Sequence, residues 1–243
     1  LDGTKTYLDI KYDEIDFVEI LQQFIVKGDN KYGVVANNGT QKIKLEYDEI
    51  KLFSGINKLY YAQKNNKKGI LDEGGDALGE NLYVEFDELG INASLFPNDN
   101  IENQMLLYNT CIPAKRGEKW GLFNIDGELV SKFEWDEFGF RANKDDRNNN
   151  NNSKNILLVP NMEGIVVCKN GKYGIIDVNG KLLAVCEFDR IYSETVGGKE
   201  KYYLQYGETI IDIENYKPEE QATPSPSPSP SPTPSVAPSP TPS

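Results

Sequence analysis

Pairs of neighbouring carboxylates recur along the 243-residue chain and are the first residues that could carry out chemistry. They are Asp48-Glu49, Asp87-Glu88 and Asp136-Glu137. Most glycoside hydrolases use two carboxyl groups, one as an acid and the other as a nucleophile or base. A catalytic pair normally occurs once in a chain, whereas these pairs recur at matching positions. Their recurrence favours a structural role, and we expect a protein that is not an enzyme.

Other common catalytic and cofactor-binding groups are absent from the sequence. The chain has no histidine, which excludes Ser-His-Asp and Cys-His catalysis and histidine-ligated zinc. It also lacks the glycine-rich phosphate-binding motifs and the spacing of an EF-hand calcium loop. We therefore expect no catalytic residue, no cofactor and no metal site.

Three cysteines stand without the CxxC spacing of zinc and redox sites. When the repeats described below are aligned, Cys186 falls at an apolar position and Cys168 at a position held elsewhere by lysine. This alignment places Cys186 in the core and Cys168 in solvent, and it predicts no disulfide between them.

Internal repeats supply the main structural signal, because three landmarks recur in register. The landmarks are a Lys-aromatic-Gly triplet, a turn glycine and an aromatic-Asp pair. From the triplet glycine to the aspartate is 15 residues in three copies and 18 in the other. The triplets contain Tyr32-Gly33, Gly69, Trp120-Gly121 and Tyr173-Gly174, and the pairs end at Asp48, Asp87, Asp136 and Asp189.

Each repeat has the pattern of a three-stranded antiparallel meander. Short apolar runs alternate with Asn-Gly or Asp-Gly turns, whose two residues favour positive φ, and with a second, lysine-rich turn. The third strand of the last full copy is expected to run from Val185 to Ile191. A glycine inside a strand indicates a bulge or a close approach of backbones. The aspartate after the aromatic residue ends the strand, where its carboxylate can accept backbone N–H groups in the following turn.

The two ends of the folded region carry complementary halves of a repeat. Residues 7–15 match only the third strand, and residues 202–215 match only the first two strands, with residues 210–215 parallel to 175–180. About five units are therefore expected, the fifth split between the termini. A closed propeller-like ring is favoured because closure removes free sheet edges, and an open β-superhelix is the alternative.

Two insertions and a tail interrupt or follow the repeats. Residues 90–110 and 140–155 are expected to be loops, the second containing a run of asparagines. Residues 1–217 form the repeat domain, and residues 218–243 a disordered Pro-Ser/Thr tail that serves as a linker or stalk. Such tails are typical sites of O-glycosylation, and the candidate acceptors are Thr223, Ser225, Ser227, Ser229, Ser231 and Thr233.

The triplets and the landmarks that follow them resemble the WG-repeat (KWG) family over about residues 7–215, with KKG at 67–69 as a departure. The resemblance implies an all-β bacterial repeat protein. Separately, the tail resembles linkers of surface and polysaccharide-degrading systems.

The overall charge and the recurrent aromatic residues bear on the partner. A net charge of −12 argues against nucleic acid and anionic membranes, and no apolar run is long enough to insert in a membrane. Tyr32, Trp120 and Tyr173 could stack on sugars, although recurrent aromatic residues in β-repeats more often belong to the core.

Together these features predict a secreted or surface-attached module that binds or scaffolds a polysaccharide or a surface protein. The alternative is a structural subunit of an extracellular filament or surface layer, which would associate with itself.

Overall fold

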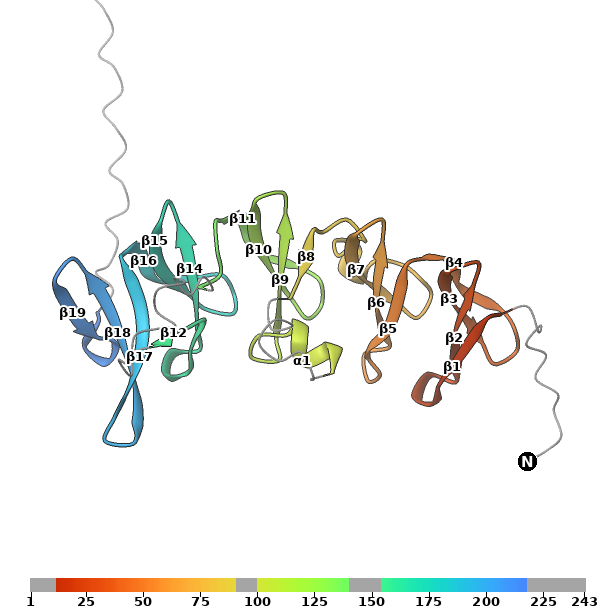
Figure 1. The fold of residues 1–243 in the computed structure, drawn as a ribbon, viewed down its shortest axis with the longest axis horizontal. Helices are drawn as coiled ribbons and strands as arrows, with labels where there is room; N and C mark the ends of the chain where they lie inside the picture. The colour runs from red at the N-terminus through yellow and green to blue at the C-terminus, as the bar shows by residue number, and fades with distance from the viewer. Residues whose placement is uncertain (1–11, 91–99, 140–153, 218–243) are drawn as a thin grey trace, which may run out of the picture.

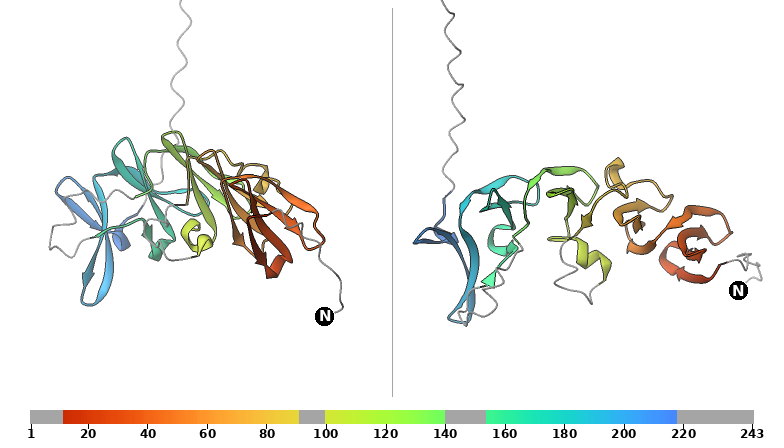
Figure 2. Two further views of the ribbon diagram at one scale, coloured as in Figure 1. Left: turned by 45° about the vertical axis from the view of Figure 1, so that its right-hand side comes forward. Right: turned by 45° about the horizontal axis from the view of Figure 1, so that its top comes forward.

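The computed structural model describes residues 12–90, 100–139 and 154–217, and these fold into five antiparallel sheets of three or four strands. The sheets stand side by side in an elongated row (Figure 1), and two further views show the same order (Figure 2). The only α-helix in the described ranges is α1, Ile101–Met105. The prediction of an all-β protein is confirmed.

The strands follow the chain from one end of the row to the other. The first sheet contains β1 (Glu14–Val18), β2 (Gln23–Gly28), β3 (Lys31–Ala36) and β4 (Gln41–Tyr47). The second contains β5 (Glu49–Ser54), β6 (Leu59–Lys64) and β7 (Lys67–Asp72). The third contains β8 (Glu88–Leu89), β9 (Cys111–Arg116), β10 (Lys119–Asn124) and β11 (Leu129–Trp135). The fourth contains β13 (Leu158–Val159), β14 (Gly164–Lys169), β15 (Lys172–Ile176) and β16 (Leu182–Phe188). The fifth contains β12 (Lys154–Asn155), β17 (Arg190–Val196), β18 (Lys199–Tyr206) and β19 (Thr209–Asp212).

The expected meander forms the larger part of the first, third and fourth sheets, as β2-β3-β4, β9-β10-β11 and β14-β15-β16. In each of these sheets one further strand, β1, β8 or β13, lies beside the meander and was not expected. The strand predicted to reach Ile191 instead ends at Phe188. The chain crosses to the next sheet at Asp189, whose backbone N–H donates to the Gln205 carbonyl at 2.8 Å, and β17 begins at Arg190.

The two turns of each repeat differ in backbone conformation. In the lysine-rich turn of the first sheet, Asp29 and Asn30 both have positive φ, 51° and 59°, as a two-residue hairpin turn requires. At the Asn-Gly turn only Gly39 has positive φ, 84°, so the expectation of positive φ at both residues is wrong there. Asn38 instead uses its side-chain oxygen to accept the Thr40 backbone N–H at 3.0 Å, which fixes a longer loop.

The triplet glycine allows two strands to approach closely, as expected from its place inside a strand. A Cβ on Gly33 would lie 2.8 Å from the Ile43 carbonyl oxygen and 2.9 Å from the Leu45 nitrogen of β4. The register between β3 and β4 shifts at this point, between the pairs Tyr32–Tyr47 and Val34–Ile43. The same shift between β15 and β16 surrounds Gly174. The triplet glycine is therefore the residue at which each meander bulges.

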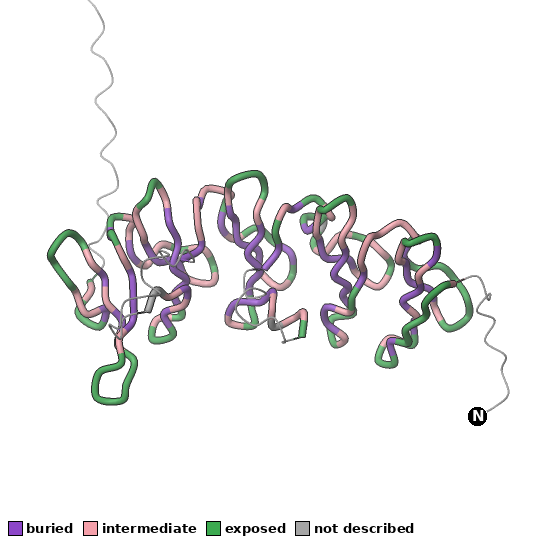
Figure 3. The backbone as a smooth tube through the Cα atoms, viewed as in Figure 1, coloured by how far each residue is buried: buried purple, intermediate pink, exposed green. Residues whose placement is uncertain are grey.

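The hydrophobic core consists of four clusters, each containing residues of two neighbouring sheets. The clusters centre on Val34 and Tyr60, on Ile70 and Ile112, on Leu122 and Ile165, and on Ile175 and Leu204. Figure 3 shows buried backbone in the middle of each unit and exposed backbone at the hairpin tips. The interior is therefore a series of clusters between successive sheets. Each sheet depends on its neighbours, as in other linear repeat proteins.

The described chain does not close on itself. Figure 1 places β1 and β19 at opposite ends of the row, and no closed barrel or propeller occurs within the described ranges. The favoured ring is thus not found among the described residues. Residues 7–11 of the N-terminal half-repeat lie outside the described residues.

The sequence of the last unit gives a physical reason for the open end. Two-residue turns precede both Lys172-Tyr173 and Thr209-Ile210. After these turns, Tyr173 pairs with Cys168, and Ile210 pairs with Gln205 in the corresponding way. Ile210 therefore corresponds to Tyr173. This is a shift of two residues from the expected alignment, in which residues 210–215 correspond to 175–180. Ile211 then stands where the other units have their bulge glycine, so a third strand cannot approach β19 in the same way.

The three cysteines are free thiols. Cys111 and Cys168 are buried, and Cys186 is half-buried. The prediction that Cys168 faces solvent is wrong: although it aligns with lysines, its place in the isolated bridge to Glu137 covers it with the neighbouring strand. Desolvation raises the pKa of Cys111 to about 12 and that of Cys186 to about 11.

Candidate functional site

The recurrent aspartates act as clamps between neighbouring sheets. One carboxylate oxygen of each accepts a hydrogen bond from the lysine of its own triplet. The other accepts a backbone N–H from a hairpin turn of the next sheet, and not from the turn that directly follows the aspartate as expected. The lysine partners are Lys31 for Asp48, Lys67 for Asp87, Lys119 for Asp136 and, at 2.5 Å, Lys172 for Asp189. The N–H partners are Asn65 at 2.7 Å, Gly117 at 2.8 Å, Asn170 at 2.6 Å and Gly207 at 2.7 Å, in the same order.

These contacts hold the pKa of each clamp aspartate below its ordinary value. The largest cause is the hydrogen bond from the triplet lysine, followed by that from the backbone N–H of the next sheet. Both donors favour the ionised carboxylate. The clamps are therefore charged at neutral pH, and each one stabilises the contact between two sheets.

At the first three boundaries, a second set of contacts joins the glutamate before the aromatic residue of the aromatic-Asp pair to a cation of the next sheet. Lys64 lies 3.1 Å from Glu46, Arg116 pairs with Glu85, and Lys169 lies 2.6 Å from Glu134. Each cation also lies over the aromatic ring of an aromatic-Asp pair, and one cation lies over a second aromatic ring as well. The distances are 5.8 Å from Lys64 to Tyr47, 5.1 and 4.9 Å from Arg116 to Phe86 and Phe133, and 5.7 Å from Lys169 to Trp135.

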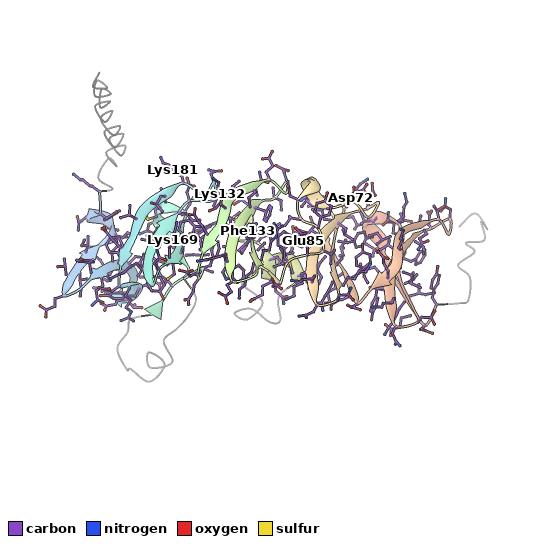
Figure 4. All side chains as sticks on the ribbon, turned by 90° about the horizontal axis from the view of Figure 1, so that it is seen from above. Asp72, Glu85, Lys132, Phe133, Lys169 and Lys181 are labelled. Carbon is purple, nitrogen blue, oxygen red and sulfur yellow. The ribbon has the colours of Figure 1, made fainter. Side chains whose placement is uncertain are left out.

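Figure 4 shows how these contacts are distributed along the molecule. Seen from above, Glu85, Phe133 and Lys169 follow one another along the long axis. The same interaction is thus repeated at successive sheet boundaries. The recurrent acidic and aromatic residues belong to this periodic structure and do not converge on one centre.

The predicted aromatic candidates occupy equivalent positions with different exposure. Trp120 is only 8% exposed and packs in the cluster between the third and fourth sheets. Tyr173 is half-buried beside the cluster between the last two sheets. Tyr32 is also half-buried, but it lines a groove. Tyr32 thus lies at a cavity between the first and second sheets.

This groove, which we call the first-boundary groove, lies between β1 and β5. It has a volume of about 660 Å³, and its walls include Asp16, Phe17 and Tyr32 of the first sheet and Lys51 and Leu52 of the second. Phe17 is 47% exposed and packs against Phe24 with ring centroids 4.9 Å apart. The groove therefore combines an accessible aromatic ring and other apolar side chains with several charged ones, which is a typical make-up for a binding site.

The charges of the groove are partly paired with one another. Lys27 lies 2.5 Å from Glu14 and 5.2 Å from the centre of the Tyr32 ring, and the hydrogen bond that Lys27 donates to Glu14 raises the Lys27 pKa. Lys51 pairs with Glu49 at 2.6 Å. Asp16 and Glu19 also line the groove, and neither carboxylate has an ion-pair or hydrogen-bond partner among the described residues. The side chains free to meet a ligand are therefore acidic.

Sequence reasoning missed the groove because it missed the strand that forms one wall. Glu14–Val18 follows the aromatic-Asp pair Tyr12-Asp13 in the same way that Glu49–Ser54 follows Tyr47-Asp48. An exposed Phe17 beside two acids in this strand was the available signal. No group of three or more potential metal ligands occurs in the described ranges. The tail candidates from Thr223 to Thr233 lie outside those ranges.

No helix in the part of the chain that the structure describes could span a membrane. A family model, the WG containing repeat, matches residues 32–67 and 120–143 and supports assigning these segments to a WG-repeat β family. No curated protein matches the chain.

Among solved structures, the chain is similar to one titled "Crystal structure of the eukaryotic initiation factor", with 13% identity and a TM-score of 0.37. The match covers 79% of this chain and 49% of that one, so the chain spans about half its length. A likeness at this level carries no argument about function.

Proposed function

We propose that this array of WG-type repeats is a non-catalytic binding module whose ligand occupies the first-boundary groove. The observation that carries the proposal is that the groove is open, whereas at two places farther along the row the chain itself packs against or pairs with the boundary. Between the second and third sheets, Met105 of α1 and the adjoining Leu106 pack in the cluster that contains Phe53 of β5. At the fifth sheet, β12 pairs with β17.

The use of the recurrent carboxylates supports a non-catalytic role. Each clamp aspartate is engaged by a lysine and by a backbone N–H group, and Glu49 and Glu88 of the neighbouring positions pair with Lys51 and Lys115. Carboxylates held in this way at every boundary stabilise the array. The groove, by contrast, contains an accessible aromatic ring and acids without a partner among the described residues. These groups suit recognition of a polysaccharide or of a surface protein.

We further propose that the module acts outside the cell or at its surface, held at a distance by the Pro-Ser/Thr tail. The tail composition from Thr223 to Thr233 supports this assignment, since such sequences are extended and accept O-linked glycans in secreted proteins. Intact mass measurement of the protein secreted by its native host tests the assignment. Hexose-sized mass increments on the tail support it, and retention of the protein in the cytoplasm refutes it.

Binding is tested with the full chain on arrays of cell-wall and plant glycans and by capture of surface proteins. The groove variant Phe17→Ala should lose the ligand, whereas Tyr206→Ala, an exposed aromatic residue at the far end of the row, should retain it. Equal binding by both variants would place the ligand elsewhere, and failure of the wild-type chain to bind in both formats would refute a binding role.

A structural-subunit role is the second candidate, because no described residue pairs with the outer edge of β19 at one end of the row. β19 is the last strand of its sheet, and Ile210 on it is 56% exposed. An open edge of this kind can pair with another chain. Sedimentation of the full chain distinguishes the two roles: polymers without ligand favour the subunit, and a stable monomer favours the binding module.

A further inference from the structure

The fifth sheet contains an internal example of what can occupy a boundary groove. β12 belongs to the insertion that interrupts the first strand of the fourth sheet, yet it pairs with the edge of the fifth. Lys154 is opposite Ser193 and Asn155 is opposite Tyr192, in antiparallel register. An extended segment thus adds one strand to the free side of β17, at the boundary between two sheets.

The positions used by β12 correspond to two residues that line the first-boundary groove. β17 and β5 both begin directly after a clamp aspartate, and their first residues Arg190 and Glu49 pair with Gln205 and Gln63. Counting along both strands from there, Tyr192 corresponds to Lys51 and Ser193 to Leu52. Lys51 and Leu52 both border the groove.

Among the described residues no strand pairs with the outer edge of β5 at Lys51 and Leu52, although α1 lies near β5 and its Met105 packs in the same cluster as Phe53. β5 is an outer strand of its sheet and pairs with β6 on its other side. Facing it across the groove are Asp16 and Glu19, whose carboxylates lack partners in the described ranges, and the exposed Phe17 and Ile20. A ligand here would meet backbone hydrogen-bonding groups, an apolar surface and uncompensated negative charge.

We propose that the first-boundary groove binds an extended, basic segment of a partner protein, which adds to β5 as an antiparallel strand at Lys51 and Leu52. Backbone hydrogen bonds hold the segment to β5, as in other cases of strand addition. Its apolar side chains cover Phe17, and its cationic side chains meet Asp16 and Glu19. This inference rests on the proposed binding function and names the partner class for the same groove.

The test uses the full chain and a fluorescent hexapeptide of alternating lysine and valine, with fluorescence anisotropy as the readout. Hydrogen exchange at the β5 amides should slow when the peptide binds. Peptides N-methylated at alternate amides, in either register, separate strand addition from simple charge attraction, because methylation removes the donors but keeps the charge. One of the two methylated peptides should bind at least about tenfold more weakly.

Matched variants test the charges of the groove. The double substitution Asp16→Asn with Glu19→Gln should weaken binding roughly three- to tenfold. The control Glu208→Gln removes an exposed acid at the far end of the row and should leave binding unchanged. Both groove substitutions are on the surface, and an unchanged melting temperature verifies that the variants fold.

Three results would overturn the inference: equal binding of the unmethylated and both methylated peptides, no change in β5 hydrogen exchange, or binding only after residues 1–11 are deleted. The last result would assign the groove to the chain's own N-terminal segment. If these peptides fail while a glycan or another protein binds and Phe17→Ala abolishes that binding, the proposed function stands and only the basic segment is refuted.

Discussion

Replacement of Gly174 by alanine tests whether the triplet glycine is required for the close approach of β15 and β16. The new Cβ would lie 2.6 Å from the Ala184 carbonyl oxygen and 2.9 Å from the Cys186 nitrogen. Ordinary contacts begin near 3.4 Å, so the two strands must separate by about 0.8 Å. Overpacking of this kind costs about 1–3 kcal/mol, and the lower entropy of the unfolded chain offsets about 0.4–1 kcal/mol of that.

We therefore expect Gly174→Ala to lower the free energy of unfolding by about 1–2 kcal/mol, or the melting temperature by roughly 2–8 °C. Urea unfolding followed by tryptophan fluorescence is a suitable assay. Both tryptophans, Trp120 and Trp135, pack in the cluster shared with the fourth sheet, to which Gly174 belongs.

Two other glycines supply controls for the same experiment. Gly74→Ala also lacks positive φ, and its Cβ would meet only the Asp72 side-chain oxygen at 3.3 Å, so its effect should stay within about 0.5 kcal/mol. Gly121→Ala should be intermediate, because its nearest backbone atom is 3.1 Å away. If Gly174→Ala is as stable as Gly74→Ala, the strands are not constrained at the bulge and the account of the triplet is wrong.

Three further predictions concern the sheet boundaries and the thiols. The folded-state pKa of Asp189 lies below its unfolded value of about 3.9, so its clamp stabilises the protein fully above that pH and loses this effect as pH falls through the lowered pKa. Urea midpoints should therefore drop between pH 5 and pH 3, less so in Asp189→Asn; an equal drop in both proteins would contradict the clamp. Arg116→Ala should cost about 0.5–1 kcal/mol of unfolding free energy through the lost pair with Glu85 and the lost ring contacts, and an unchanged urea midpoint would show that this boundary does not need it. Cys111, buried and with its pKa raised to about 12, should react with a thiol reagent at pH 8 only on unfolding, and rapid labelling of the native protein would show that it is accessible.

The repeat landmarks predicted the hairpins and the bulge glycines because these depend on a few neighbouring residues. At Gly33, for example, the close approach of the next strand alone explains why a side chain is not tolerated. The sequence could not reveal that Asp48 contacts the turn at Asn65, since that partner is a backbone group with no residue signature. The open end of the row also could not be predicted. It depends on Ile211, which stands at the position of the bulge glycine, and this correspondence becomes clear only when the hairpin register is known.

The candidate site was harder to predict than the fold. Tyr32 was identified, but Asp16 and Phe17 were not, because an exposed aromatic residue in a short strand resembles ordinary surface sequence. The second insertion was expected to be only a loop, yet two of its residues, Lys154 and Asn155, form a strand. Pairing of this kind depends on where a distant edge lies in space, which no local pattern encodes.

The separation of the core into clusters between successive sheets gives the array an adjustable length. Duplication of the third unit would add one sheet, one cluster and one aspartate clamp, and would leave both ends unchanged. The distance between the first-boundary groove and the tail could then be lengthened in steps of one repeat while the groove keeps its shape. Variation in repeat number would in this way change the distance between the groove and the tail without changing the residues that line the groove.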